Sequence, residues 1–393
     1  MRVKRGNDTH SRLTISAAGW VLIAFIVCAG ALTWFSGWQG LASMVVVAVC
    51  ALLIGFVTVL RPVTFHVDID VPADRVVVGK VCVAQIVVRA GGRESAPTVI
   101  DLPVGDATAT FLVPRLKKGQ EWRESFLIPT SRRQVLVVGP AIGVRSDGLS
   151  LVSRDTVLSG EREVFVHPAT VLPDYDAVGL LRDIEGVTTE KLSPSDASFH
   201  ALRDYVSGDD RRFVHWPTTA RLGRLVVRQF EETRRSHHVV IVDTRAQSYG
   251  GRVEDTGELA LSLAASFGVE AIIADRAVTV WSHAGRFRCA VPSALLDDFT
   301  RTQFESEGAR LATVVHEAVT AVPQASAVTI VTGKAVPQGE VLRAVREIPL
   351  STHGLVIRTN HRGRPKRSTV GGVDQFILSS LDDIRRVSRV ASP

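Results

Sequence analysis

The sequence predicts a membrane-anchored α+β multidomain protein: a two-helix transmembrane hairpin, an immunoglobulin-like β-sandwich and a doubly wound α/β domain. Two uncharged stretches of membrane-spanning length lie near the N-terminus, short alternating runs follow, and strand-like runs alternate with helical patterns in the second half. Of the 393 residues, 46% are hydrophobic and 22% charged, a composition that excludes disordered and fibrous proteins. The expected parts are a basic cytoplasmic N-terminus at 1–16, the transmembrane hairpin at 17–60, the β-sandwich at 61–170, a linker at 171–236 and the α/β domain at 237–393.

The transmembrane hairpin is predicted from residues 15–35 and 41–60, which contain no charged side chain. A helix of about 20 residues spans the roughly 30 Å hydrocarbon core of a bilayer. The short break between the runs contains Gly residues and Trp38, which suits a turn at the membrane interface. An alternative is a cleaved signal peptide with a small-residue site at 29–31, although the second run would then remain as an anchor.

The charges that flank the hairpin predict its orientation. Arg2, Lys4, Arg5 and Arg12 precede the first run, the connecting loop has no Lys or Arg, and Arg61 follows the second run. The positive-inside rule therefore predicts that both termini and the soluble domains are cytoplasmic. The four cysteines have no paired spacing, so we expect neither a disulfide framework nor a zinc cluster.

Short runs rich in Val and Ile predict the β-sandwich. Apolar and polar side chains alternate along them, and Gly or Pro residues separate them, as in strands joined by turns. The predicted strands are residues 64–69, 81–88, 110–113, 121–128, 134–138 and 163–166. No nucleophile and base occur together in this part, so we expect a spacer or docking module.

Residues 195–235 are unusually rich in Arg and Asp, with eight arginines from position 203 onward. Their side chains can form bidentate ion pairs that tie loops to a sheet, or present Arg and aromatic anchors to a partner protein. A third interpretation is the acid–base site of a hydrolase, formed by His215 with Asp209 or Asp204, because histidine titrates near neutral pH. A phosphate-binding surface is less favoured, since the acids nearly balance the arginines.

The spacing in this segment is specific. The string L-R-D-Y begins at Leu202, and the pattern G-D-D-x-R-x-hydrophobic-x-W-x-x-x-A-R begins at Gly208. Together with Asp147-Gly148-Leu149 upstream, it resembles the bacterial domain-of-unknown-function family number 58, whose usual plan includes a membrane hairpin. Pro217 departs from the family, and we expect it to end or kink a helix through Trp216.

The resemblance implies that this segment joins the soluble domains and forms a partner-binding face. The residues assigned to that partner-binding or interdomain face are Arg203, Asp204, Tyr205, Gly208, Asp209, Asp210, Arg212, Trp216, Arg221, Arg224 and Arg228.

Residues 237–393 alternate strand-like and helical runs, which predicts a mostly parallel sheet wound on both faces. The predicted strands are 238–242, 277–281, 286–290, 327–331 and 355–358, and the predicted helices are 253–270, 293–304, 307–321, 338–346 and 379–389. By resemblance to the family, this is a von Willebrand factor A-like domain.

Such domains often bind Mg²⁺ through an Asp-x-Ser-x-Ser loop after the first strand. Asp243 holds the first position of a degenerate loop here, with Arg245 and Gln247 in place of the serines and Lys334 after a later strand. Positive charge at two of these places opposes a dication, so we expect no metal, magnesium included, and no other cofactor. The chain also lacks a phosphate-binding P-loop and a Gly-x-Ser-x-Gly elbow.

The formal charge of +6 is concentrated in residues 1–16 and 358–367, so we expect no nucleic-acid partner. The second of these stretches contains five cations and no acid. It is either a solvated connection or a contact with anionic lipid.

The family resemblance implies a membrane-tethered adaptor or chaperone-like scaffold in the bacterial inner membrane. It also implies a MoxR-type AAA+ ATPase as partner, in the assembly or remodelling of envelope complexes. We therefore do not expect an enzyme. The hydrolase described above and a purely structural membrane scaffold remain as alternatives.

Overall fold

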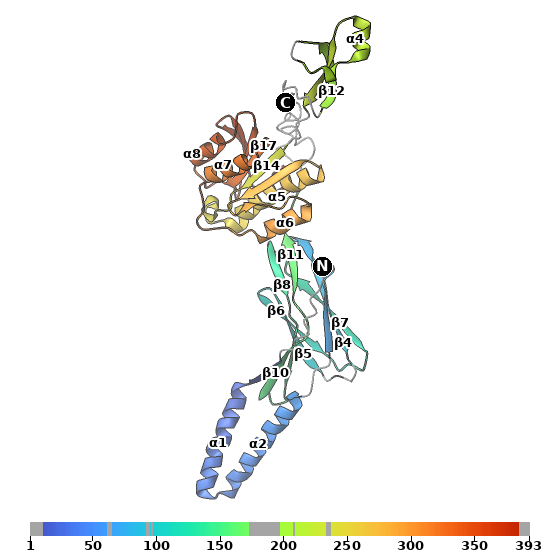
Figure 1. Cartoon of the computed structure of the whole chain (residues 1–393). Coiled ribbons are helices and arrows are strands. Elements are labelled where there is room, and N and C mark those ends of the chain that lie inside the picture. Colours follow the sequence, from blue (N-terminus) through green and yellow to red (C-terminus); the bar gives the residue numbers. More distant parts are fainter. Residues whose placement is uncertain are drawn as a thin grey trace. The chain divides into compact units, whose positions relative to one another are not determined.

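Figure 1 shows the computed structural model of the chain. The structure describes residues 11–60, 65–91, 95, 97–172, 197–206, 209–232 and 237–384. The chain divides into two compact units, Met1–His167 and Pro168–Pro393, and each is described by itself. The first contains two apolar helices and two β-sheets, and the second contains a β-hairpin and a larger sheet with helices.

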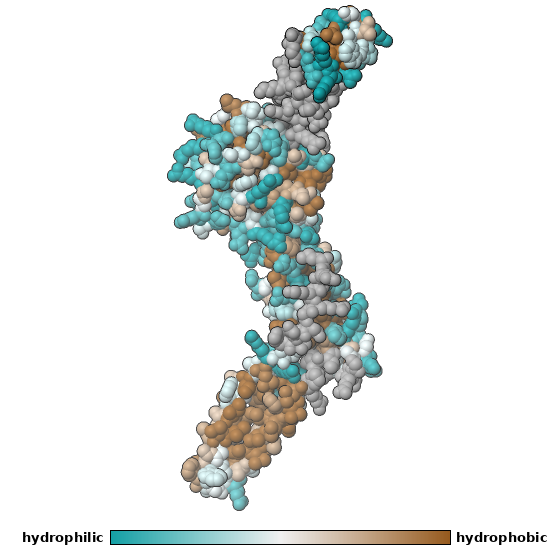
Figure 2. Space-filling model, viewed as in Figure 1, coloured by the Kyte–Doolittle hydropathy of each residue, from teal (hydrophilic) through white to brown (hydrophobic). Residues whose placement is uncertain are grey.

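Two apolar helices, α1 (Ala17–Ser36) and α2 (Gln39–Leu60), lie where the sequence predicts the hairpin. The hydroxyl of Ser16 caps α1 by accepting a hydrogen bond from the N–H of Gly19, and Gly37 ends the helix in the left-handed conformation that glycine favours. Most of their large side chains face outward, and Figure 2 shows a nearly continuous apolar surface over both helices. Two N-terminal helices of this kind suggest membrane anchoring.

The rest of the first unit consists of two sheets that share one core. One has the strand order β2-β4-β7, and the other has the order β1-β10-β9-β5-β8-β11-β3, with β6 paired to β5. Ile86 and Val88 from the first sheet and Ile100 and Leu102 from the second are fully buried in one cluster, so the sheets pack against each other. The strands are β1 (Ser11–Ile15), β2 (Phe65–Asp70), β3 (Arg75–Val77), β4 (Cys82–Ala90), β5 (Thr98–Val104), β6 (Ala107–Val113), β7 (Glu121–Ile128), β8 (Gln134–Val138), β9 (Ile142–Ser146), β10 (Val152–Val157) and β11 (Arg162–His167).

The basic N-terminus expected at 1–16 also contains the strand β1, which was not predicted. This strand pairs antiparallel with β10, with Ser11 opposite Thr156 and Ile15 opposite Val152. A pairing between segments this far apart in the sequence leaves no local periodic signal, and five residues are too few to show one. The strands β3, β5, β9 and β10 were also not predicted, because polar residues such as Arg154 interrupt their apolar pattern.

The turn between β9 and β10 lies against the ends of α1 and α2. The N–H of Ser16 donates to the carbonyl oxygen of Leu151 at 3.0 Å. A Cβ atom on Gly19 would lie 2.4 Å from that oxygen, and one on Gly55 would lie 3.1 Å from Oδ2 of Asp147. Asp147 shapes the turn by accepting hydrogen bonds from two of its backbone N–H groups. The absence of side chains at Gly19 and Gly55 therefore allows the turn to pack closely against both helices.

The predicted linker contains a β-hairpin in its described part. The strands β12 (Ala197–Asp204) and β13 (Val226–Glu232) pair antiparallel, and a 3₁₀ turn (Arg211–Phe213) and the short helix α4 (Trp216–Leu222) lie between them. The sequence predicted that Pro217 ends or kinks a helix. This prediction is wrong, because Pro217 lies in the first turn of α4. Proline is tolerated there because the N–H groups of the first turn have no partner within the helix.

The second unit also contains a mixed sheet of seven strands, in the order β16-β15-β14-β17-β18-β20-β19. The five inner strands are parallel, and β16 and β19 pair antiparallel at the edges. Their bounds are β14 (His237–Val242), β15 (Ala277–Ser282), β16 (Gly285–Arg286), β17 (Ala325–Gly333), β18 (His353–Thr359), β19 (Lys366–Val370) and β20 (Val373–Leu378). The helices are α5 (Glu258–Ile273), α6 (Pro292–Arg301), α7 (Leu311–Ala321) and α8 (Gln338–Arg346).

Helices cover both faces of this sheet, as Figure 1 shows. Val240 and Val242 are buried with α5 and α6, whereas Val239 and Ile241 on the opposite face are buried with α7 and α8. A π-turn (Val253–Gly257) precedes α5, and the combined segment is apolar and long enough to cross a membrane, but most of it is buried in this core.

The structure differs from the prediction at three strands of this unit. The strand expected at 286–290 is only the two-residue β16, and the basic strand β19 and its partner β20 were missed. Of the helix predicted at 379–389, the start is a turn in which Asp383 accepts hydrogen bonds from the N–H groups of Ser379 and Ser380, residues 383–384 are helical, and residues 385–389 lie outside the described residues.

Candidate functional site

The β12–β13 hairpin brings together residues that lie about 20 positions apart in the sequence. Arg203 lies opposite Val227 and Asp204 lies opposite Val226 in the antiparallel register. Val214, Val226 and Val227 are each buried, and Val214 forms an isolated antiparallel bridge with Val227. The polar residues between the strands are therefore held at one end of a compact element.

Arg203 and Asp209 form a bidentate ion pair. Nη1 donates to Oδ2 and Nη2 donates to Oδ1, each at 2.7 Å, and the N–H of Val206 donates to Oδ2 at 2.9 Å. These hydrogen bonds, that of Arg203 first, lower the pKa of Asp209 to about 2. The pair joins the end of β12 to the turn that follows it, as the ion-pair interpretation of this segment predicted.

Two further acids of the segment, Asp204 and Asp210, also accept hydrogen bonds from within the hairpin. Nη1 of Arg224 donates to Oδ2 of Asp204 at 2.6 Å, although both side chains are more than half exposed. Oδ1 of Asp210 accepts a hydrogen bond from the N–H of Arg212 at 2.9 Å and caps the 3₁₀ turn. These contacts order the loop between the strands.

His215 caps the helix α4. Its Nδ1 atom lies 3.3 Å from the N–H of Thr218, which donates to it, and 2.8 Å from the hydroxyl oxygen of the same residue. Among the described residues, no contact joins His215 to Asp209 or Asp204, whose carboxylates bind arginines instead. The geometry therefore gives no support to the acid–base site of the hydrolase hypothesis.

A second group of residues in this segment is exposed. Trp216 is 64% exposed, and Arg212, Arg221 and Arg228 point into solvent without a side-chain partner in the described part of the chain. Figure 2 shows polar and apolar side chains next to each other on this hairpin. We call Arg212, Trp216, Arg221 and Arg228 the exposed set. Tyr205 is half-buried, and Gly208 lies outside the described residues.

Asp243, at the end of β14, is fully buried and contacts Arg245. Nε and Nη2 of Arg245 donate to Oδ1 and Oδ2 of Asp243 at 3.1 and 2.9 Å. Hydroxyls of Ser248 and Thr332 donate to Oδ2 at 2.7 and 2.8 Å. Nη1 of Arg245 also lies 2.8 Å from Oε1 of Glu340.

The electrostatics of this cluster favour an ionised carboxylate. Burial raises the pKa of Asp243, but the hydrogen bonds and charge of Arg245 outweigh it, so the pKa lies below its ordinary value. The guanidinium contacts both oxygens of the carboxylate, so Asp243 already has a cationic partner. Gln247 lies in the short 3₁₀ turn Ala246–Tyr249 that these contacts order.

The basic stretch 358–367 begins in β18 and ends in β19, and the loop between these strands contains the exposed residues Arg362 and Arg364. A contact of this loop with anionic lipid stays a prediction. Arg358 belongs to β18 and is buried, and it donates to the carbonyl oxygen of Lys334 and to Oε1 of Gln338 at 2.7 and 2.6 Å. Burial lowers the pKa of Arg358. Arg367 in β19 forms two hydrogen bonds with Asp374, both at 3.1 Å. The sequence pattern did not reveal these partners because they lie on other strands and loops.

Residues 201–326 match the family described as "Protein of unknown function DUF58". This confirms the resemblance for that part of the chain, which includes most of the hairpin and the first half of the larger sheet. No curated protein matches the chain.

Two solved structures show limited likeness. The CARDB domain of a Pyrococcus furiosus protein, in complex with di-metal ions, is 18% identical, with 26% of this chain and 91% of that chain covered and a TM-score of 0.21. The sporulation control protein Spo0M from Bacillus subtilis is 13% identical, with 31% of this chain and 56% of that chain covered and a TM-score of 0.18. At these TM-scores, neither likeness bears on function.

Proposed function

Starting from the DUF58 family domain at residues 201–326, we propose that this protein is a membrane-tethered adaptor whose β12–β13 hairpin docks a partner protein. The observation that carries the proposal is that the hairpin contains two kinds of residue. Some charged residues form ion pairs within the hairpin, whereas the exposed set, one tryptophan and three arginines, is accessible to solvent. Trp and Arg are the side chains that most often dominate binding at protein interfaces.

The internal contacts make the exposed set suitable for binding. The Arg203–Asp209 pair and the cap from His215 fix the segments on either side of Arg212 and Trp216 before any partner arrives. An ordered surface loses less conformational entropy on association than a mobile one does. The three arginines favour a partner with an acidic face, since complementary charge speeds association and selects the partner.

The family resemblance supplies the kind of partner, a MoxR-type AAA+ ATPase. In this proposal the apolar helices hold the chain in a bacterial inner membrane, and the positive charge that flanks them supports a cytoplasmic position for the β-sheets and the α/β domain. The β-sheets of the first unit act as an immunoglobulin-like spacer, and the mixed sheet of the second is a von Willebrand factor A-like domain. The adaptor then supports the assembly or remodelling of envelope complexes.

Affinity capture from native membranes tests the proposal. The full-length chain is purified after mild crosslinking, together with the variants Trp216→Ala and Arg221→Ala and the control Arg346→Ala. Arg346 is exposed on α8, so its loss changes the net charge equally but leaves the hairpin intact. We expect the first two variants to lose an acidic ATPase that the wild type and the control retain. If Trp216→Ala and Arg221→Ala both fold and both retain every partner, the exposed set does not bind a partner. The alternative of a purely structural scaffold is then favoured.

A further inference from the structure

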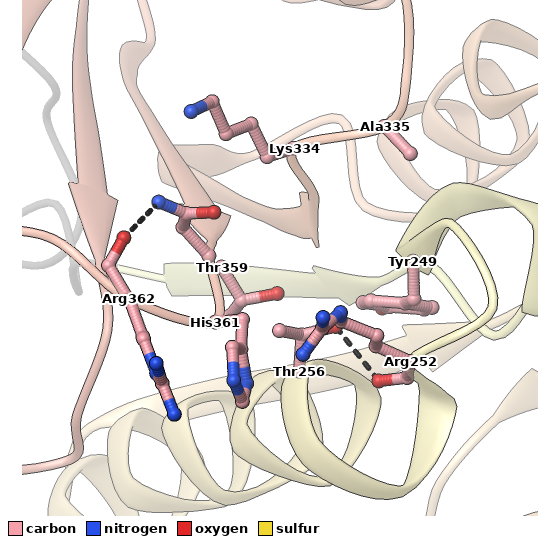
Figure 3. Close-up of a pocket in the computed structure, with 9 residues that line it drawn as sticks. Tyr249, Arg252, Thr256, Lys334, Ala335, Thr359, His361 and Arg362 are labelled. Atoms are coloured by element: carbon pink, nitrogen blue, oxygen red, sulfur yellow. Dashed lines mark hydrogen bonds between the residues drawn. The ribbon is translucent and has the colours of Figure 1, made fainter.

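The second unit contains a cavity at the carboxyl ends of three parallel strands. Its volume is about 580 Å³ (Figure 3). The residues that the argument uses are Tyr249 and Arg252 after β14, Lys334 after β17, Thr359 at the end of β18, and His361 and Arg362 after it. The strand β14 lies between β15 and β17, so the strands that follow it in the sequence lie on both sides of it in the sheet. Open α/β sheets bind ligands in the crevice at such a point.

The lining of this cavity is positively charged. Arg252, Lys334 and Arg362 are exposed, have no acidic side-chain partner among the described residues, and no acid lines the cavity. His361 does have an acidic neighbour, since its Nδ1 atom lies 3.2 Å from Oδ2 of Asp255. In Figure 3, Lys334 lies on a different wall from the other basic side chains. Cations on separate walls of a cleft raise the local concentration of anions.

Thr359 adds an independent observation at this cavity. The residue is 1% exposed and lines the cavity, yet its hydroxyl Oγ1 is buried without any hydrogen-bond partner. The backbone of Thr359 is already satisfied on this side, because its carbonyl oxygen accepts a hydrogen bond from the N–H of Lys334 at 2.9 Å. Buried hydroxyls are nearly always paired, so the unpaired hydroxyl of a residue that lines a basic cavity is a donor without an acceptor.

The aromatic wall of the cavity is fixed. The hydroxyl of Tyr249 donates a short hydrogen bond to the carbonyl oxygen of Asp243, and its ring packs edge-to-face on Phe304 with centroids 5.3 Å apart. Tyr249 therefore offers its ring, not its hydroxyl, to the cavity. The buried Asp243–Arg245 pair holds the loop that carries Tyr249, so the wall is set before a ligand binds.

We propose that this cavity binds the phosphate group of a small molecule. A phosphate has several acceptor oxygens and up to two negative charges, which match the donors of Arg252, Lys334, Arg362 and Thr359. Gly333-Lys334 is not part of a P-loop, so side chains on three loops hold the group in place of a glycine-rich backbone. The site is independent of the hairpin and of the adaptor role proposed above.

Calorimetric titration of the detergent-solubilised full-length chain with inorganic phosphate, at constant ionic strength set with chloride, tests the site. We expect saturable binding that Arg252→Ala and Lys334→Ala each weaken by about tenfold or more, because each removes a charge-assisted hydrogen bond. Arg346→Ala removes the same charge outside the cavity and should bind phosphate as the wild type does. Absent binding, or equal weakening by Arg346→Ala, overturns the proposal.

The variant Thr359→Val separates a ligand-binding role from a structural one. Because the hydroxyl has no partner, its replacement by a methyl group should leave the melting temperature without phosphate unchanged or higher, and should reduce the rise that phosphate causes. A lower melting temperature without phosphate, with the phosphate-induced rise intact, contradicts the assignment. Trp216→Ala should leave phosphate binding unchanged, so the two proposals fail separately.

Two organic phosphates identify the source of the group. Tighter binding of a nucleoside monophosphate than of inorganic phosphate indicates a base against the ring of Tyr249, whereas tighter binding of glycerol 3-phosphate indicates a lipid headgroup. Either preference supports the site when Lys334→Ala weakens it. A preference that Lys334→Ala leaves unchanged places the ligand elsewhere and overturns the proposal.

Discussion

Arg245 holds its guanidinium against the carboxylate of Asp243, with Nη2 2.9 Å from Oδ2 and Nε 3.1 Å from Oδ1, and neither side chain is more than 5% exposed. The same carboxylate accepts hydrogen bonds from the hydroxyl of Ser248, in the 3₁₀ turn that follows, and from that of Thr332, near the end of β17. The cluster thus ties together three segments at the carboxyl edge of the sheet, beside the cavity that Tyr249 lines.

Removal of Arg245 should destabilise the second unit severely. The variant Arg245→Ala leaves the carboxylate of Asp243 buried without its charge partner, which destabilises a protein by about 3–5 kcal/mol. Urea unfolding of the full-length chain, followed by the fluorescence of its tryptophans, measures the change. Arg346→Ala is the matched control, and an exposed substitution of this kind changes the free energy of unfolding by about 0.5 kcal/mol or less. Equal effects of the two variants would mean that the pair contributes nothing.

The same pair predicts the response to magnesium. Because the guanidinium of Arg245 already contacts both oxygens of the Asp243 carboxylate, calorimetric titration of the wild type with Mg²⁺ or Mn²⁺ should give no stoichiometric signal. The variant Arg245→Ser with Gln247→Ser restores an Asp-x-Ser-x-Ser loop and tests whether the arginine is what prevents binding. A stoichiometric signal from the wild type that Asp243→Ala abolishes would falsify this account.

His238 predicts how stability depends on pH. It is fully buried on β14, and burial first, then the charges of Arg276 and His237, lower its pKa from 6.5 to about 3. Between these values the unfolded chain binds a proton at this position and the folded chain does not. The contribution of His238 to the free energy of unfolding is therefore complete above pH 6.5 and is lost as the pH falls, at about 1.4 kcal/mol per pH unit.

Urea unfolding between pH 6.5 and pH 5 checks this slope. The variant His238→Gln retains a hydrogen-bonding group for Thr329, whose hydroxyl lies 2.9 Å from Nε2, but it cannot be protonated. It should flatten the dependence by the amount given above. An unchanged slope in His238→Gln contradicts the direction of the pKa shift.

Glycine at position 19 is predicted to be required for its contact with the β9–β10 turn. Alanine stabilises an ordinary helix interior by up to about 1 kcal/mol relative to glycine. At Gly19, however, the new Cβ would lie 2.4 Å from the carbonyl oxygen of Leu151, which is backbone and cannot easily move. Gly19→Ala should therefore lower the melting temperature in detergent. Gly30→Ala in the same helix, where nothing lies within 4 Å, should not lower it.

The sequence predicted those parts of the fold that have a local periodic signal. The apolar helices and α8 begin and end within a few residues of their predicted limits, because uncharged runs and helical spacing are properties of one segment. Strands that depend on distant partners were missed. The strand β1 pairs with β10, and β19 consists largely of charged and hydroxyl residues that become a strand only beside β20.

The sequence predicted the type of interaction in the hairpin, but not which residues form each contact. Ion pairing within residues 203–228 was anticipated, but not that Asp209 pairs with Arg203, since a bidentate geometry depends on the turn between them. The burial of Arg358 was not predicted, because the groups that accept its hydrogen bonds lie elsewhere in the sequence. Thr359 carries no sequence signal at all, because an unpaired hydroxyl is recognised only from its surroundings.

Photo-crosslinking at the exposed set tests the adaptor proposal most directly. A photoreactive amino acid replaces Trp216 in the full-length chain in its native membrane, and the control position is Leu350, which is fully exposed in the same unit. The account predicts one discrete protein adduct at position 216, weakened by Arg212→Ala or Arg221→Ala, and none at position 350. Equal labelling at both positions, or no adduct at position 216, would contradict it.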